Sequence, residues 1–141
     1  MNWILHVPYD THYAIVALMV ACVLPFVFAF LAKMVSGFDF KTDNQNPRAF
    51  LAQTTGLSAR LNAVQANSFE SLPIFIGAVL VAMYCFVPQN VVNGMAWLYV
   101  VLRLIYGVAY AMNLATFRSV VWGLSLVCCL QLFYFAIKMI W

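Results

Sequence analysis

Apolar residues run along this chain in four long segments, each long enough for a helix that crosses a bilayer. The first covers residues 13–35 and is interrupted only by Pro25, which a membrane helix tolerates. The other three cover approximately residues 57–86, 91–114 and 119–140. A spanning helix needs about 20 apolar residues to cross roughly 30 Å of hydrocarbon. The pattern therefore predicts an all-α membrane protein, with residues 1–141 forming one four-helix transmembrane domain.

The connections between these segments are short, except for the first. Residues 37–56 collect aspartate, lysine, asparagine and proline, a composition typical of a solvated loop that leads into the next helix. VPQN at residues 87–90 indicates a turn, and ATFRS at residues 115–119 a brief linker. Tight connections favour antiparallel neighbours, so we expect an up-down-up-down bundle.

The composition and the placement of charge both indicate a membrane protein. Hydrophobic residues make up 66% of the chain and charged residues 8%, whereas a soluble domain carries charge on roughly a quarter of its positions. The basic residues Lys33, Lys41, Arg48 and Arg118 all belong to loops on one side. By the positive-inside rule we expect that side to be cytoplasmic and both termini to lie outside. No basic cluster with interleaved aromatics indicates a nucleic-acid partner.

The cysteines and tryptophans have structural interpretations. Four cysteines lie in or beside apolar segments, with no C-x-x-C spacing and no histidine at ligand spacing, so we expect neither a disulfide nor a metal site. The tryptophans are expected to anchor the helices at the membrane interfaces; they are Trp3, Trp97, Trp122 and Trp141.

Two charged residues fall where the chain should be deepest in the bilayer. A charge at mid-bilayer costs roughly 2.5 to 3.5 kcal/mol on insertion scales. Glu70 lies about 13 residues into the second segment and Arg103 about 12 residues into the third, so at 1.5 Å per residue both lie near the midplane. Although the two helices run in opposite directions, both charges lie at the same depth and can meet. We predict an intramembrane ion pair between Glu70 and Arg103.

Further polar side chains continue the faces that carry these two charges. At 100° per residue, one polar stripe contains Arg60, Asn67, Glu70 and Ser71, and a second contains Arg103, Tyr106, Tyr110 and Asn113. One interpretation is that these groups only hold helices together. The other is a polar cavity open to the cytoplasmic side, suited to an anionic or zwitterionic small molecule that meets a lipophilic one.

Two segments carry a resemblance to a known family. RLNAVQANSFESLP, residues 60–73, resembles the helix-two signature of the membrane-associated proteins in eicosanoid and glutathione metabolism (MAPEG), which has Arg, then Gln-x-Asn-x-x-Glu, then Pro. RLIYGVAYAMNLATFRSVVW, residues 103–122, resembles the end of that family's third helix and the linker into the fourth. With the four-span layout, the resemblance covers essentially the whole chain. Bacterial-type members resemble it best, which implies a bacterial inner membrane.

The resemblance implies a homotrimer that binds glutathione, as a co-substrate, between adjacent subunits near the cytoplasmic side. Matched position by position, the helix-two polar cluster would consist of Arg60, Asn67 and Glu70. Arg103 would pair with Glu70, and Tyr110 would contact glutathione. Tyr106 occupies a position that varies within the family, and we include it among the candidate binding residues.

The catalytic candidates are Arg118 and Ser119, which resemble an Arg-Ser pair that flanks the glutathione thiol in the microsomal prostaglandin E synthase branch. An arginine beside the sulfur would lower the pKa of the thiol by favouring thiolate. That thiolate would attack a lipophilic electrophile or hydroperoxide from the bilayer. The chain departs from the eicosanoid enzymes at Ala63 and Ala66, where those enzymes commonly have arginines that clamp glutathione carboxylates. The linker before Arg118 is also one residue shorter than in that branch.

Three functions stay open at this point. The first is a glutathione transferase or peroxidase whose partners are membrane lipids, a lipophilic substrate and further copies of the chain. The second is a non-catalytic lipid-binding scaffold, like the five-lipoxygenase-activating protein of the same family, which the two alanines favour. The third is a small ion-coupled transporter lined by Glu70 and Arg103, although no inverted repeat or pair of broken helices supports it.

Overall fold

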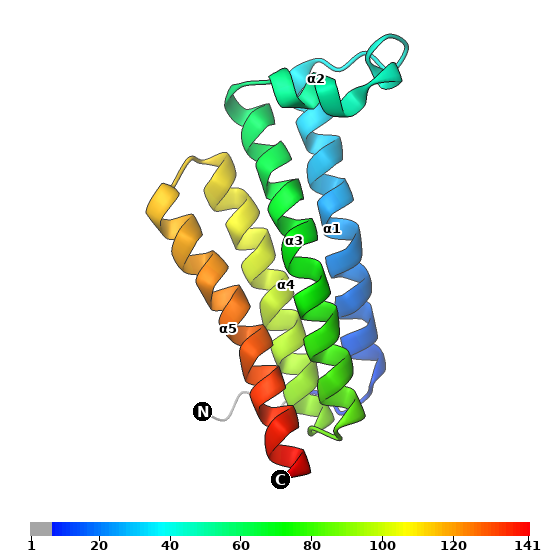
Figure 1. Ribbon diagram of the computed structural model, residues 1–141, viewed down its shortest axis with the longest axis vertical. Helices are drawn as coiled ribbons and strands as arrows, with labels where there is room; N and C mark the ends of the chain where they lie inside the picture. The colour runs from blue at the N-terminus through cyan, green and yellow to red at the C-terminus, as the bar shows by residue number, and fades with distance from the viewer. Residues whose placement is uncertain (1–6) are drawn as a thin grey trace.

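The computed structural model describes residues 7–141, and the part of the chain it describes consists of helices joined by turns and short loops. Four long helices run alternately up and down (Figure 1): α1 His12–Ser36, α3 Gly56–Tyr84, α4 Gln89–Ala111 and α5 Ala115–Ile140. Two short elements, η2 Asp43–Gln45 and α2 Pro47–Gln53, lie between α1 and α3. All four long helices are long and apolar enough to span a membrane, which confirms the predicted all-α membrane class.

The bundle has two distinct ends. Helix α2 lies across one end, beside the start of α3, and the turn between α4 and α5 faces the same way (Figure 1). We call this the loop end. The opposite end carries the start of α1, the end of α5 and the turn between α3 and α4, and we call it the termini end.

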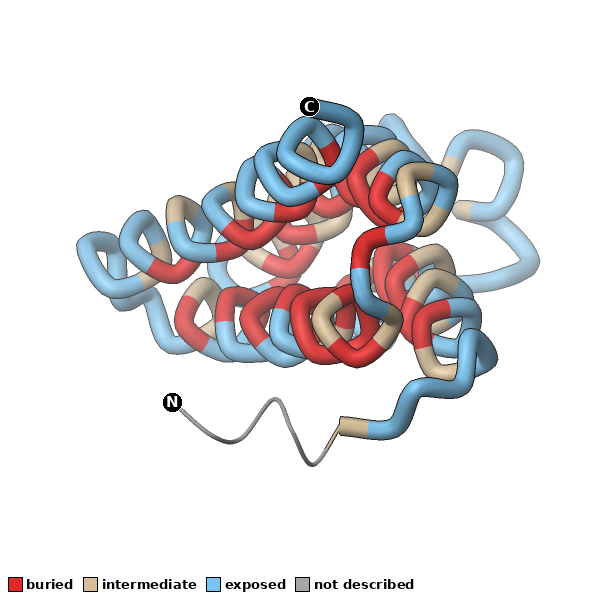
Figure 2. Tube along the Cα trace, turned by 90° about the horizontal axis from the view of Figure 1, so that it is seen from below, coloured by how far each residue is buried: buried red, intermediate tan, exposed pale blue. Residues whose placement is uncertain are grey.

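Helix α4 is the most buried helix of the bundle. Like α3, it packs against the other three long helices, and its spanning segment is more buried than that of any other helix. Seen along the bundle, the buried positions of all four helices face inward while the outer faces are exposed (Figure 2). These outer faces are apolar, as a lipid-facing surface must be.

Small residues let α1 approach its neighbours closely. Four of its seven buried residues are alanines, Ala14, Ala17, Ala21 and Ala32. A hydrogen bond joins each end of α1 to a neighbouring helix. The Ser58 hydroxyl of α3 donates to the Ala32 carbonyl (2.9 Å), and the Trp97 indole of α4 donates to the Tyr13 carbonyl (3.1 Å). Trp97 thus forms a hydrogen bond within the protein, and its role as an interfacial anchor stays a prediction. Trp3 lies outside the described residues.

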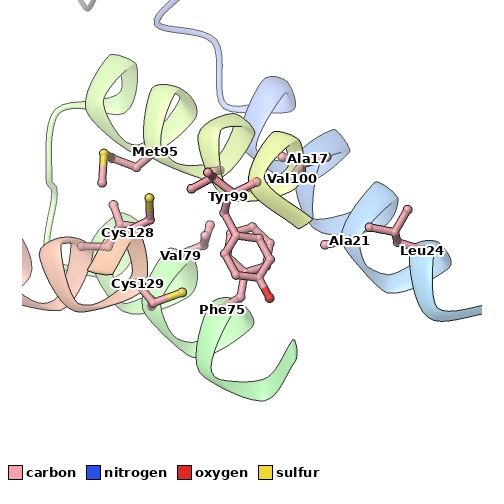
Figure 3. Packing of buried hydrophobic residues seen from close by; sticks show 14 of the residues in the cluster. Ala17, Ala21, Leu24, Phe75, Val79, Met95, Tyr99, Val100, Cys128 and Cys129 are labelled. Carbon is pink, nitrogen blue, oxygen red and sulfur yellow. The ribbon is translucent and has the colours of Figure 1, made fainter. Parts of the chain in front are cut away.

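Apolar side chains from all four helices fill the centre of the bundle (Figure 3). The rings of Phe75 and Tyr99 stack face to face, with centroids 3.9 Å apart and planes 6° apart. Cys128 and Cys129 are buried beside them, and all four cysteines of the chain are free thiols.

Residues 37–56 contain more structure than the predicted solvated loop. Gly37, in the left-handed region (φ 70°), ends α1. Helix α2 then begins where Asn46 accepts a side-chain hydrogen bond from the Ala49 amide (3.4 Å) and Pro47 takes the first helical position. That capping pattern is visible in the sequence, but the segment is too short for its apolar periodicity to show.

Two other connections are shorter than predicted, because the helices begin earlier. Gln89 and Asn90 belong to α4, not to a turn. The predicted linker at residues 115–119 is the first part of α5, and the reversal before it occurs at Asn113, which adopts a left-handed conformation (φ 60°). Arg118 and Ser119 therefore lie on a helix.

Gly107 tests the close packing of α4 on α1. A Cβ atom at this position would overlap the ring of Phe28, which has little room to move. We expect Gly107→Ala to lower the free energy of unfolding by about 1–3 kcal/mol, measured by denaturation in detergent and followed by circular dichroism. Gly123→Ala is the matched control, since its Cβ meets nothing within 4 Å. Replacing the ring by a smaller side chain, with Phe28→Leu in the Gly107→Ala variant, should restore part of the lost free energy of unfolding. Equal stability of the two glycine variants would contradict this packing.

Candidate functional site

Arg103 is the most buried charged residue of the described chain, with 2% of its surface exposed. It lies well inside α4, and its Nη2 donates to Asn67 Oδ1 (3.0 Å) and to Ser68 Oγ (2.9 Å) on α3. Among the described residues, its Nε and Nη1 atoms have no hydrogen-bond partner. A buried guanidinium with two donor nitrogens unused can accommodate an additional acceptor.

The predicted ion pair between Arg103 and Glu70 does not form in the single chain. No ion pair joins the two residues in the part of the chain that the structure describes, where Arg103 bonds to Asn67 and Ser68 instead. The reason is the rotation of α3: at 100° per residue, Glu70 points roughly 110° away from the direction midway between Asn67 and Ser68. Glu70 is consequently exposed at the side of the helix pair.

Four of the predicted site residues form a continuous stack along α4 and the start of α5. The Arg103 guanidinium lies 4.5 Å from the centroid of the Tyr106 ring, and the Arg118 guanidinium lies 4.1 Å from that of Tyr110. The two tyrosine rings contact each other edge to face, with centroids 5.5 Å apart. We call these four residues the arginine–tyrosine stack. Cation–π contact holds each guanidinium in place while leaving its donors available.

Arg60 and Ser119 lie near the loop end of this stack. Arg60 Nε donates to the carbonyl of Ala111, the last residue of α4 (3.2 Å), so its positive charge complements the negative end of that helix. The Ser119 hydroxyl donates to the carbonyl of Ala115 in its own helix (3.1 Å), which leaves its oxygen free to accept. Both residues thus flank the α4–α5 turn.

A cavity of about 180 Å³ opens between α3, α4 and α5. Its lining combines polar groups with apolar walls: Asn67, Glu70, Ser71, Ile74, Tyr99, Trp122, Ser125, Leu126 and Cys129. Asn67 joins the cavity to the stack, because it also accepts the hydrogen bond from Arg103. On the cavity wall, the Tyr99 hydroxyl donates to Ser71 Oγ (3.0 Å).

The structure thus brings together most of the residues proposed from the sequence. Asn67 bonds to the stack, Arg60 and Ser119 flank its loop end, and Glu70 lies on the cavity wall. Reasoning from the sequence missed Ser68, Tyr99, Trp122, Ser125 and Cys129. The signal for α5 was present, since Arg118, Trp122, Ser125 and Cys129 recur at helical spacing. Trp122, which was predicted as an interfacial anchor, also lines the cavity.

A double-mutant cycle can measure the bond that fixes Arg103. We expect Arg103→Met and Asn67→Leu to show a coupling of about 1–2 kcal/mol in the free energy of unfolding, because each removes the same charge-assisted hydrogen bond. Arg103→Met with Glu70→Gln serves as the comparison cycle and should give less than about 0.5 kcal/mol for the isolated chain. Stronger coupling to Glu70 than to Asn67 would overturn the arrangement described above.

One comparison with known proteins identifies the chain. A family model described as the MAPEG family matches residues 13–138, a range that contains all the site residues named above. No curated protein and no solved structure gives a significant match. The match covers nearly the whole chain, so this integral membrane protein belongs to the MAPEG family of glutathione and eicosanoid metabolism.

Proposed function

We propose that this protein is a glutathione-dependent transferase or peroxidase that acts, as a homotrimer, on lipophilic electrophiles or hydroperoxides. The observation that carries the proposal is the arginine–tyrosine stack, which aligns two guanidinium groups and is joined to the cavity through Asn67. Family membership supports glutathione as the anion that the stack receives.

The charges of the site complement those of glutathione, which carries two carboxylates and one ammonium group. Arg103 offers the N–H groups of its two unpaired nitrogens, and Arg60 adds positive charge near the loop end. Glu70 is the one acidic residue of the cavity wall and suits the ammonium group. Asn67 and Tyr110 supply neutral polar contacts beside these charges.

Arg118 and Ser119 are the proposed catalytic residues. The Arg118 guanidinium, held on the Tyr110 ring, would stabilise the glutathione thiolate over the thiol. With an electrophile, the sulfur forms a bond to carbon and the leaving group departs with the electron pair. With a hydroperoxide, the sulfur attacks the terminal oxygen and the O–O bond breaks. An alcohol and a glutathione sulfenic acid result, and a second glutathione converts the latter to the disulfide and water. Ser119 Oγ would accept a hydrogen bond from the thiol before ionisation.

A second candidate function is lipid binding without chemistry. At positions 63 and 66 the chain has alanines, whose side chains cannot clamp a carboxylate. Ala66 also lines a different pocket, between α1, α2 and α3, rather than the cavity that Asn67 joins to the stack. Glutathione would then have fewer charged contacts than in the eicosanoid enzymes.

Glutathione binding and turnover separate these two functions. We expect the purified full chain in detergent to bind glutathione at or below millimolar concentration by calorimetry. The protein should also conjugate glutathione to an apolar aryl halide or oxidise glutathione with a lipid hydroperoxide. Arg118→Gln should reduce kcat/KM roughly a hundredfold or more, because it removes charge beside the reacting sulfur, while changing the glutathione Kd far less.

Lys138→Gln is the matched control for Arg118→Gln. Lys138 also lies over a tyrosine of α5, Tyr134, at 5.9 Å, but at the termini end of the helix. The Lys138→Gln variant should keep full activity. Binding of glutathione without any turnover would favour the lipid-binding alternative, and no binding at millimolar concentration would refute the glutathione proposal.

A further inference from the structure

A separate group of side chains able to bind a ligand lies at the termini end, away from the arginine–tyrosine stack. A groove of about 520 Å³ runs between the end of α3 and the end of α5 (Figure 1). We call it the sulfur groove, because three of its six lining residues carry sulfur. It shares no lining residue with the cavity between α3, α4 and α5. The lining residues are Met83, Tyr84, Cys85, Phe86, Met139 and Ile140.

Two of the sulfur-bearing side chains come from the end of α3. Met83 lies in its last turn and Cys85 is its C-cap residue, and both are half-buried and pack against the core. Their aromatic neighbours Tyr84 and Phe86 are 84% and 85% exposed. The Phe86 amide donates to the Met83 carbonyl (3.2 Å), which closes the end of the helix. At this end, therefore, the sulfur-bearing side chains are turned inward and the aromatic ones outward.

The third sulfur-bearing side chain comes from α5. Met139 lies in the last turn of that helix and is half exposed. Helices α3 and α5 pack against each other, which brings donors from two helices to one groove. Because methionine has three rotatable bonds, its thioether can adjust to a ligand.

The donors of the sulfur groove are soft. Among residues 7–141, no histidine, aspartate or glutamate lines it, and Cys85 is a free thiol. Thiolate and thioether ligands select Cu(I), whereas a structural Zn²⁺ site takes four ligands from cysteine, histidine and carboxylate. The expectation of no metal site considered only the spacing of cysteine and histidine, and the methionine thioethers add donors that this spacing does not reveal.

We propose that the sulfur groove binds one Cu(I) ion through Cys85, Met83 and Met139. On binding, the Cys85 thiol releases its proton to water, and each of the three sulfur atoms donates an electron pair to the metal. Copper stays Cu(I), so no oxidant or reductant is consumed. One thiolate neutralises one monovalent cation, whereas a divalent ion would leave a net positive charge beside an apolar bundle, which is costly.

Competition for Cu(I) tests this proposal with the purified full chain in detergent, in the absence of air and glutathione. We expect the protein to withdraw one Cu(I) per chain from its coloured complex with bicinchoninate. Cys85→Ser should weaken Cu(I) binding roughly a hundredfold, and Met83→Leu or Met139→Leu roughly tenfold each, because each variant lacks one sulfur donor. Exchange of methionine for leucine conserves volume, so these variants should fold, as circular dichroism can verify. X-ray absorption at the copper edge should find one sulfur neighbour fewer in each methionine variant.

Cys22→Ser and Met34→Leu are the matched controls. Cys22 is half-buried like Cys85, Met34 is exposed like Met139, and both control residues lie on α1 outside the sulfur groove. The two controls should bind Cu(I) like the unmodified protein. Equal losses in the controls would overturn the proposal in favour of nonspecific sulfur binding, as would displacement of Cu(I) by Zn²⁺ at equal concentration.

Unchanged Cu(I) binding in the double variant Met83→Leu with Met139→Leu would also overturn the proposal, and would leave the two methionines as apolar packing. The measurement contains no glutathione and changes no residue of the arginine–tyrosine stack or its cavity. A negative copper result therefore leaves the proposed function intact.

Discussion

A guanidinium inside a membrane helix must find its hydrogen-bond partners in the protein, because hydrocarbon offers none. In this chain Arg103 finds them on α3, in Asn67 and Ser68, and its remaining face rests on Tyr106. That arrangement fixes how α4 is rotated and how far it is shifted along α3. Every other polar contact of the site follows from that register, because Tyr106 and Tyr110 are carried on the same face of α4.

Helix α4 is polar at its termini end as well. The Asn93 amide donates to the carbonyls of Pro8 (2.7 Å) and Asp10 (3.0 Å), and Gln89 donates to Asn93 Oδ1 (2.8 Å). The segment before α1 is thereby bonded to α4, while Arg103 bonds α4 to α3. An apolar bundle has little hydrophobic force to set one helix against another within lipid, so these few polar bonds decide its register.

The four long helices could be predicted from the sequence because the bilayer imposes their length and apolar character directly. The rotation of each helix could not. A stripe drawn over about 100° includes both Asn67 and Glu70, yet only the former faces Arg103, and the neighbouring Ser68 supplies the second acceptor. Helix α2 was not predicted either: its capping residues Asn46 and Pro47 are visible in the sequence, but the helix is too short for apolar periodicity to show. The cavity combines residues from three helices, so no single stripe contains it.

The cavity between α3, α4 and α5 is polar even though the ion pair between Glu70 and Arg103, which first suggested a polar cavity, does not form. Its wall is built from Asn67, Ser71 and Tyr99, and Glu70 contributes a carboxylate that no basic side chain neutralises within the described part of the chain. A carboxylate at this depth on an outward face is costly in lipid. In the proposed assembly, a neighbouring subunit would cover that face and the ammonium group of glutathione would supply the missing charge. Glu70 would then be stabilised most when both are present, which would couple ligand binding to assembly of the copies.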